Sequence, residues 1–339
     1  MNKMKGYIKL IALLCLLILI CFEGMAQRQT FTQYYLNLPA INAGFTGFEP
    51  FLDMKTAYRQ RWNNFSEKNN SFYISAYGSL GSTSPTVFRN NALRVSNPST
   101  YGRLARNKNL KRKHGLGGMV MSQTVGPFKS LETSANYAYH LPITGLTSLS
   151  FGTRISYNNY EIDFSVFDVR EHPDVVYDEL LEAGGKQQQF VGDFGIVLYT
   201  SRFFFGLSSS NLVASSFGSG RLLELPSDLS LEFLAGSQFE LSPYVELYPG
   251  IRMRHSEIYG LSWEVNARLR YNKLIYLGAV YQNDVKASLL FGLTFDSRYN
   301  INYSYDYYLN DLREFSTGNH EFTLGIAIFN KYSTEPRLW

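Results

Sequence analysis

Charged side chains at alternate positions are the chemically most informative feature of this sequence. Within residues 244–254 and 262–272, acidic and basic residues share one parity, while the other parity is apolar or aromatic. Neighbouring positions of a β-strand face opposite sides, so these charges would project from one face of a sheet and pair across adjacent strands. We therefore predict a polar face lining a wet lumen, formed by Glu246, Arg252, Arg254, Glu264, Arg268, Arg270 and Asp306.

The residues that enzymes use as nucleophiles, bases and metal ligands are not arranged for catalysis. None of the five histidines has HxxxH spacing, and no GxSxG, phosphate-binding or dinucleotide-binding motif occurs. Some membrane β-barrels are phospholipases or proteases, so the class alone does not exclude an enzyme. Without a nucleophile constellation, however, we expect no catalytic activity, no cofactor and no metal.

The first 26 residues have the pattern of a secretion signal peptide. Lysines precede an apolar run over residues 10–21, and Gly24 and Ala26 are the small residues expected before a cut after Ala26. The run is too short to span a bilayer comfortably as a helix. A lipoprotein signal using Cys21 is a weaker alternative, because Ile20 stands where a small residue is needed. Cleavage would remove both cysteines and with them any disulfide.

Period-two alternation continues along the rest of the chain and predicts about fourteen strands. Each is about 9–11 residues long, as a tilted strand crossing the hydrocarbon requires. Aromatic residues make up 16% of the chain, which fits the aromatic girdles of a membrane barrel. The predicted strands are 51–62, 71–80, 115–124, 130–141, 148–158, 190–200, 202–211, 229–241, 244–254, 262–272, 274–283, 287–295, 300–308 and 320–329.

The predicted fold is all-β: a transmembrane, antiparallel, up-and-down β-barrel of about 14 strands. A soluble sandwich, with its apolar faces turned inward, is the alternative. The predicted organisation has four parts: a signal at 1–26, a periplasmic or lumen-associated segment at 27–50, the barrel at 51–329 and a tail at 330–339.

Loop lengths alternate between short and long, as they do in outer-membrane barrels with short periplasmic turns. One connection breaks the alternation, because residues 81–114 are long and basic although parity places them in the periplasm. A solvated insertion is one explanation; a docking surface for an acidic periplasmic partner is the other. The net charge of +4 is too small to indicate nucleic-acid binding. The candidate partner surface consists of Lys108, Lys111, Arg112 and Lys113.

Four short motifs are spread over nearly the whole mature chain. They are Gln33-Tyr34-Tyr35-Leu36-Asn37 continuing through Asn42 to Gly47; Tyr58-Arg59-Gln60-Arg61-Trp62 with Phe65; Gly115-Leu116-Gly117 followed by Val125-Gly126-Pro127; and Tyr303-Ser304-Tyr305-Asp306 followed by Gly318-Asn319-His320-Glu321 and Leu324-Gly325.

These motifs resemble those of the PorP/SprF family of outer-membrane proteins of the type IX secretion system. The chain departs from the family pattern at Leu38 and Ala43, where prolines are usual, and in the long insertion at 81–114. The resemblance implies a non-enzymatic barrel in the outer membrane that supports export or surface attachment of cargo bearing a C-terminal signal domain. It also implies partners, namely the periplasmic lipoprotein ring, the translocon and the cargo domain. A passive channel or uptake barrel is the alternative function.

Overall fold

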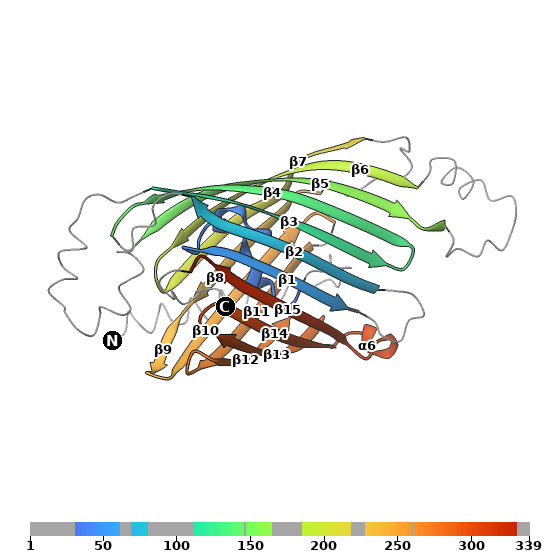
Figure 1. The fold of residues 1–339 in the computed structure, drawn as a ribbon. Helices are drawn as coiled ribbons and strands as arrows, with labels where there is room; N and C mark the ends of the chain where they lie inside the picture. The colour runs from blue at the N-terminus through green and yellow to red at the C-terminus, as the bar shows by residue number, and fades with distance from the viewer. Residues whose placement is uncertain are drawn as a thin grey trace, which may run out of the picture.

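The strands, in which apolar and polar side chains alternate, form a closed barrel, and neighbouring strands are all antiparallel (Figure 1). The computed structural model describes residues 31–61, 69–80, 112–145, 147–164, 185–217, 228–258 and 260–330. Its elements are η1 (Tyr34–Ala40), η2 (Ala43–Phe45), β1 (Leu52–Gln60), β2 (Asn69–Leu80), β3 (Lys113–Val125), β4 (Phe128–Pro142), β5 (Ser148–Ile162), β6 (Lys186–Tyr199), β7 (Phe203–Phe217), β8 (Ser230–Ser237), β9 (Phe239–Ser242), β10 (Val245–Ser256), β11 (Gly260–Tyr271), β12 (Ile275–Gln282), β13 (Lys286–Phe295), β14 (Tyr299–Tyr308), α6 (Leu312–Phe315) and β15 (Asn319–Ile328).

The ring has fourteen strands because β8 and β9 are one strand with a local break. Gly236 pairs with Gly250 and Phe239 with Leu247, so the register is the same on both sides of the break. Pro249 lies between these pairs and has no N–H to donate to the ladder. Each strand pairs with its sequence neighbours, and β15 closes the ring on β1. The predicted fold class is therefore confirmed.

The outward face of the barrel is apolar and the inward face is polar. Outward side chains remain exposed although they are large and hydrophobic, as with Leu289 at 70% and Ile155 at 65%. Inward side chains are sealed from solvent, as with Ser304 at 0% and Asn302 at 1%. A soluble sandwich would show the reverse, since its apolar face would be the buried one. Among the described residues, no helix is long and apolar enough to cross a membrane.

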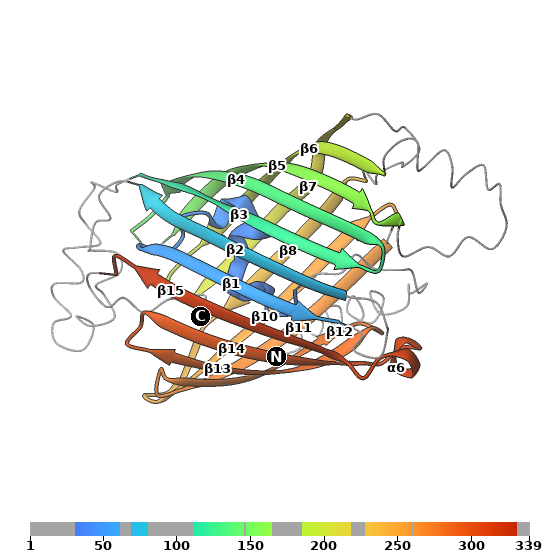
Figure 2. The same cartoon turned by 45° about the vertical axis from the view of Figure 1, so that its right-hand side comes forward.

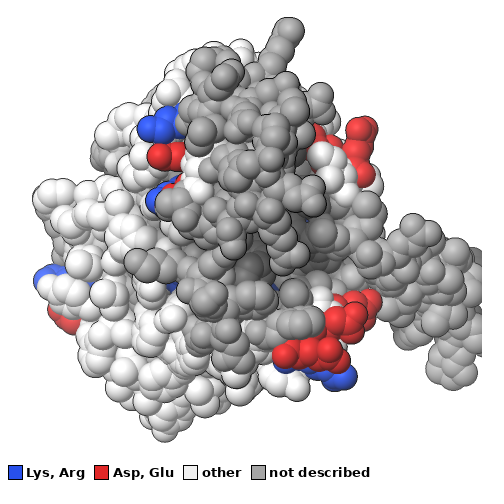
Figure 3. Space-filling model, turned by 90° about the vertical axis from the view of Figure 1, so that its right-hand side faces the viewer, with Lys and Arg blue, Asp and Glu red and all other residues white. Residues whose placement is uncertain are grey.

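The strands are strongly tilted, and the two ends of the barrel differ (Figures 1 and 2). The end we call the short-turn end carries the tight connections after β4, β6, β9, β11 and β13. The opposite, long-loop end carries the long connections after β5, β7 and β14, but the turns after β3, β10 and β12 are also short. Patches of acidic side chains lie around the long-loop rim (Figure 3). The predicted alternation of short and long loops is therefore present only in part.

Arginine substitutions along β15 are expected to report the depth of the lipid-facing surface. Leu324 pairs with Thr56 near the middle of β1, so Leu324→Arg should lower folding stability by about 2 kcal/mol, since it places a cation in hydrocarbon. Phe329, 74% exposed beyond the strand, is the matched rim position, where arginine should cost less than about 1 kcal/mol. Urea unfolding in lipid vesicles measures both, and equal losses would contradict this placement.

Candidate functional site: a lumen filled by the N-terminal segment

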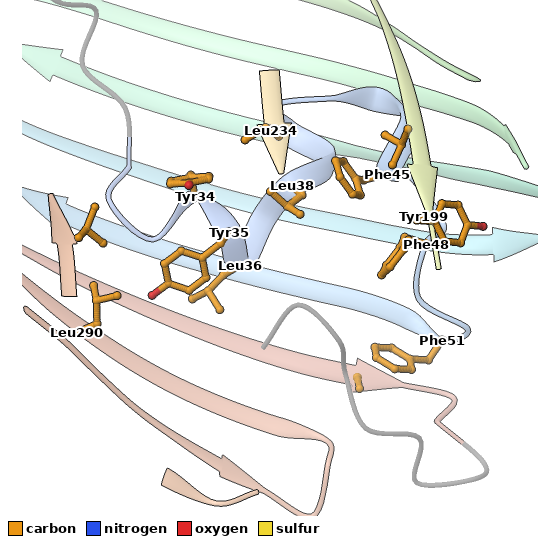
Figure 4. Close-up of a cluster of buried hydrophobic side chains, with 13 residues drawn as sticks. Tyr34, Tyr35, Leu36, Leu38, Phe45, Phe48, Phe51, Tyr199, Leu234 and Leu290 are labelled. Carbon is orange, nitrogen blue, oxygen red and sulfur yellow. The ribbon is translucent and has the colours of Figure 1, made fainter. Parts of the chain in front are cut away.

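Residues 31–50, which we call the plug, occupy the inside of the barrel (Figure 4). Leu36 and Phe45 are 0% exposed and belong to one apolar cluster with wall residues that include Val197 and Leu234. Phe45 makes an edge contact with Phe204, with ring centres 5.2 Å apart. The plug and the wall therefore share one hydrophobic core inside the lumen.

The plug sequence forms tight turns rather than a strand because its aromatic and amide residues do not alternate. Pro39 lies inside η1, and Asn42 caps η2 by accepting a hydrogen bond from the Gly44 N–H at 2.9 Å. The amide nitrogen of Asn42 also donates to the wall carbonyl oxygens of Leu207 at 3.0 Å and Ile196 at 3.3 Å. One asparagine thus shapes the turn and ties it to the wall.

A buried charge cluster, which we call the anchor cluster, holds the start of the plug towards the long-loop end. Asp306 pairs with Arg59 at 2.6 Å and with Lys286 at 3.1 Å, and it accepts a hydrogen bond from the Thr32 hydroxyl at 2.8 Å. Glu321 accepts the backbone N–H groups of Thr32 at 2.8 Å and Gln33 at 3.0 Å. The cluster joins β1, β13, β14 and β15 to the plug, so it also fastens the seam where the ring closes.

The anchor cluster brings together three motifs that are far apart in the sequence. Arg59 comes from the motif of the first strand, whereas Asp306 and Glu321 come from the closing motif. Gln33 opens the N-terminal motif. The structure therefore gives a shared physical role to residues that the sequence could present only as separate patterns.

The end of the plug is held near the short-turn end by a second set of polar contacts. His140 bonds through Nε2 to the Thr46 carbonyl oxygen at 2.7 Å and through Nδ1 to the Tyr199 hydroxyl at 2.9 Å. Arg154, paired with Asp193 at 2.5 Å, also donates to the carbonyl of Ala40. Here charged and polar wall residues satisfy plug backbone groups that water would otherwise satisfy.

Inward glycines leave room for the backbone of the plug to lie against the wall. A Cβ atom at Gly152 would fall 2.2 Å from the Ala43 carbonyl carbon, and one at Gly115 would fall 1.9 Å from the Thr46 oxygen. Both contacts are with backbone, which side-chain rotation cannot relieve. These two strand positions therefore require glycine while the plug is in place.

Two adjacent plug tyrosines contact the charged face of β10 and β11. The Arg252 guanidinium lies 4.9 Å from the Tyr34 ring centre, and the Tyr34 hydroxyl accepts a bond from Asn266 at 2.8 Å. Arg268 lies 3.8 Å from the Tyr35 ring centre. The two tyrosines therefore join the plug to this charged face of the wall.

The structure places all seven residues of the predicted polar face on the inside of the barrel. Glu246 pairs with Arg270 at 2.5 Å, while Arg252 and Arg254 share Glu232 at 2.6 and 3.1 Å. Glu264 lies opposite Arg252 in register, Arg268 packs on aromatic rings, and Asp306 belongs to the anchor cluster. These residues meet each other and the plug rather than a broad water-filled lumen.

The predicted partner surface is described only in part. Lys108 and Lys111 lie outside the described residues, as do the predicted signal at 1–26 and residues 331–339 of the predicted tail. Arg112 is exposed, but Lys113 donates to the plug carbonyls of Gly47 at 2.7 Å and Phe48 at 3.0 Å. Lys113 therefore holds the plug and is not a free docking residue.

Sequence reasoning missed several of the residues that hold the plug. Thr32, Asn136 and His140 are single polar residues with no distinctive spacing, and their partners are distant in the sequence. The available signal was the density of aromatic and amide residues in 31–50 without strand alternation. In the part of the chain that the structure describes, no cluster of three or more histidine, cysteine or acidic residues could hold a metal ion.

Together, the lipid-facing surface and the filled lumen define a membrane β-barrel plugged by its own N-terminal segment. A family model described as "Type IX secretion system membrane protein PorP/SprF" matches residues 24–326. The chain belongs to the PorP/SprF family, and it is a β-barrel of the outer membrane. No curated protein matches the chain.

The chain is also similar, at low sequence identity, to several solved structures of bacterial proteins. A Pseudomonas aeruginosa FadL homologue is 10% identical, with 89% of this chain and 99% of that chain covered and a TM-score of 0.47. Omp33 of Acinetobacter baumannii is 7% identical, with 83% and 100% covered and a TM-score of 0.43. The Pseudomonas putida toluene transporter TodX is 10% identical, with 89% and 94% covered and a TM-score of 0.45.

Proposed function

We propose that this barrel is a non-enzymatic accessory of type IX secretion that supports export or surface attachment of cargo carrying a C-terminal signal domain. It acts by binding the cargo, the export machinery or both. The machinery components are the periplasmic lipoprotein ring and the translocon, and the barrel flank contacts outer-membrane lipids. Family membership indicates the type IX secretion system. The filled lumen is the observation that favours an accessory over a passive channel or uptake barrel.

The filled lumen bears on the choice because a solute channel needs exposed, hydrated inward side chains. Here Ser150, Asn300 and Glu321 are no more than 1% exposed, although they come from different strands. The plug is hydrogen-bonded to Ser150 and Glu321, and its apolar side chains pack against Val197 and Leu234 of the wall. A plugged barrel is suited to present its rims and loops to protein partners rather than to conduct solutes.

Deletion of the gene separates the two functions. For an accessory, proteins with the C-terminal signal domain should disappear from the cell surface, as measured by protease shaving and mass spectrometry. Uptake of small solutes should be unchanged. Normal surface display together with reduced solute permeability would instead support the passive channel.

The basic connection between β2 and β3 is the proposed docking surface for an acidic periplasmic partner. It joins these strands at the short-turn end of the barrel, and in outer-membrane barrels the end with short turns faces the periplasm. Charge reversal of Lys108, Lys111 and Arg112 to glutamate, leaving Lys113 to hold the plug, should weaken co-purification of that partner. Folding should survive, because loops tolerate such changes. Salt should weaken the wild-type contact, since screening acts within about 10 Å at 0.1 M.

The matched control is Lys129→Glu, which reverses a half-exposed lysine at the opposite, long-loop end, where it pairs with Asp163 at 2.8 Å. This variant should retain the periplasmic partner. Undiminished recovery of the partner with the triple reversal would mean that the segment is only a solvated insertion.

A further inference from the structure

A small cavity of about 50 Å³ lies between the plug and the wall, beside the break between β8 and β9. Its mouth at the short-turn end is formed by the turn that contains Ser201 and Arg202, and by Gln238. The volume is enough for a few water molecules or one group the size of a carboxylate. Tyr35 of the plug and the wall residues Tyr248 and Arg268 also line it.

Arg268 differs from the other arginines that face the plug from β10 and β11. Arg252 and Arg270 each pair with a carboxylate at 2.6 and 2.5 Å, respectively. Arg268 is only 8% exposed, and its Nε atom is buried without a hydrogen-bond partner. Within the described residues, no carboxylate forms an ion pair with it. Burying a cation without an anion costs free energy, so an anion that reached Arg268 would form a favourable ion pair with it.

The surroundings of Arg268 orient its guanidinium for an anion. Its central carbon lies 3.8 Å from the Tyr35 ring centre and 5.5 Å from that of Tyr248. Aromatic rings cover the faces of a guanidinium and leave the N–H groups in its plane free to donate. A carboxylate can accept two of these N–H groups in parallel. Arg202 is exposed at the mouth, where it lies 3.9 Å from Glu240, so the entry path carries one charge of each sign.

We propose that this cavity is a binding site for a carboxylate group that enters from the short-turn end and pairs with Arg268. The cavity has room only for the carboxylate, so the rest of a larger ligand would extend outward through the mouth. The carboxylate could belong to a small organic acid or to the free C-terminus of a peptide. This site is independent of the secretion role proposed above.

The test uses the mature protein folded in detergent, with trifluoroacetate as the small-acid probe followed by fluorine NMR. A short peptide with a free C-terminus, compared with the same peptide amidated, is the second probe. Wild-type protein should bind at least one probe saturably. Arg268→Gln should weaken that binding about tenfold or more, since a charged hydrogen bond contributes roughly 1.5–3 kcal/mol. Arg298→Gln, at an exposed turn and paired with Asp296 at 3.7 Å, is the matched control and should bind normally.

Two further variants keep the test decisive if Arg268→Gln folds poorly. Arg268→Lys retains the charge but loses the paired N–H geometry, so its affinity should fall between wild type and Arg268→Gln. Arg202→Gln alters only an exposed side chain at the mouth, and it removes the cation that lies beside the Glu240 carboxylate there, so it should weaken carboxylate binding about threefold.

The outcomes separate the sources and can overturn the proposal. Trifluoroacetate binding identifies a small-acid site, whereas peptide binding that is lost on amidation identifies a chain terminus. The proposal is wrong if neither probe binds wild type saturably, if Arg268→Gln binds as well as wild type, or if only the peptide binds and amidation has no effect.

Discussion

Asp306→Ala is expected to destabilise the barrel by about 3–5 kcal/mol, because it leaves two buried cations without their shared anion. Arg59 and Lys286 contact Asp306 at 2.6 and 3.1 Å, and their side chains are no more than 5% exposed. The substitution also removes the acceptor of the Thr32 hydroxyl, so only the backbone bonds to Glu321 hold the start of the plug in this cluster and the segment should loosen. Urea unfolding in lipid vesicles measures the loss, and limited proteolysis of residues 31–50 measures the release of the plug.

The matched control for this change is Asp296→Asn at the short-turn end, which removes the charge and suits the positive φ of 51° at this turn position. Asp296 also pairs with a basic residue, Arg298, but at 3.7 Å and with both side chains largely exposed. Surface ion pairs contribute little, so this variant should change stability by less than about 1 kcal/mol. If the two variants lose the same stability, the anchor cluster does not hold the barrel and plug together.

Gly152→Val should prevent the plug from occupying its place on the wall. The first added carbon would already lie 2.2 Å from the Ala43 carbonyl carbon and 2.3 Å from the Gly44 nitrogen. The backbone must move to relieve this overlap. Overpacking typically lowers stability by about 1–3 kcal/mol, and this substitution should reach or exceed the upper end of that range. The expected result is a barrel that still inserts into membranes, with residues 31–50 cleaved much faster than in wild type.

Gly192→Ala is the appropriate comparison, since it also adds a side chain to a strand glycine. Its Cβ would meet Val213 only at 3.7 Å, an ordinary contact, and Gly192 faces outward on β6. This variant should protect the plug as well as wild type does. Equal protease sensitivity in Gly152→Val and wild type would show that the plug does not lie against this wall.

The barrel wall could be predicted from sequence because its signal is local. The alternation of Glu264, Asn266 and Arg268 with Val265 and Ala267 determines which side meets lipid, whatever the rest of the chain does. Strand ends were less predictable. β7 continues to Phe217 instead of ending near 211, since Ser208–Ser210 and Ser215–Ser216 interrupt the alternation of apolar and polar residues.

The plug and its anchors could not be placed from sequence for a different physical reason. The contact of Thr32 with Asp306 spans 274 residues, and no periodicity connects such distant positions. The two inner turns have no amphipathic pattern, so the segment could equally have been periplasmic. The expectation of a wet lumen also followed from the polar face alone, which cannot show that another part of the same chain fills the space.

Planar-bilayer recording tests most directly whether the barrel is closed by its own N-terminal segment. Purified protein that begins at Gln27, after the predicted signal, should insert without steady conductance, whereas a variant that also lacks residues 31–50 should show persistent open channels. Gly152→Val should give intermittent openings. Stable ohmic conductance of the wild-type protein, unchanged when residues 31–50 are removed, would contradict the filled lumen and favour a passive channel.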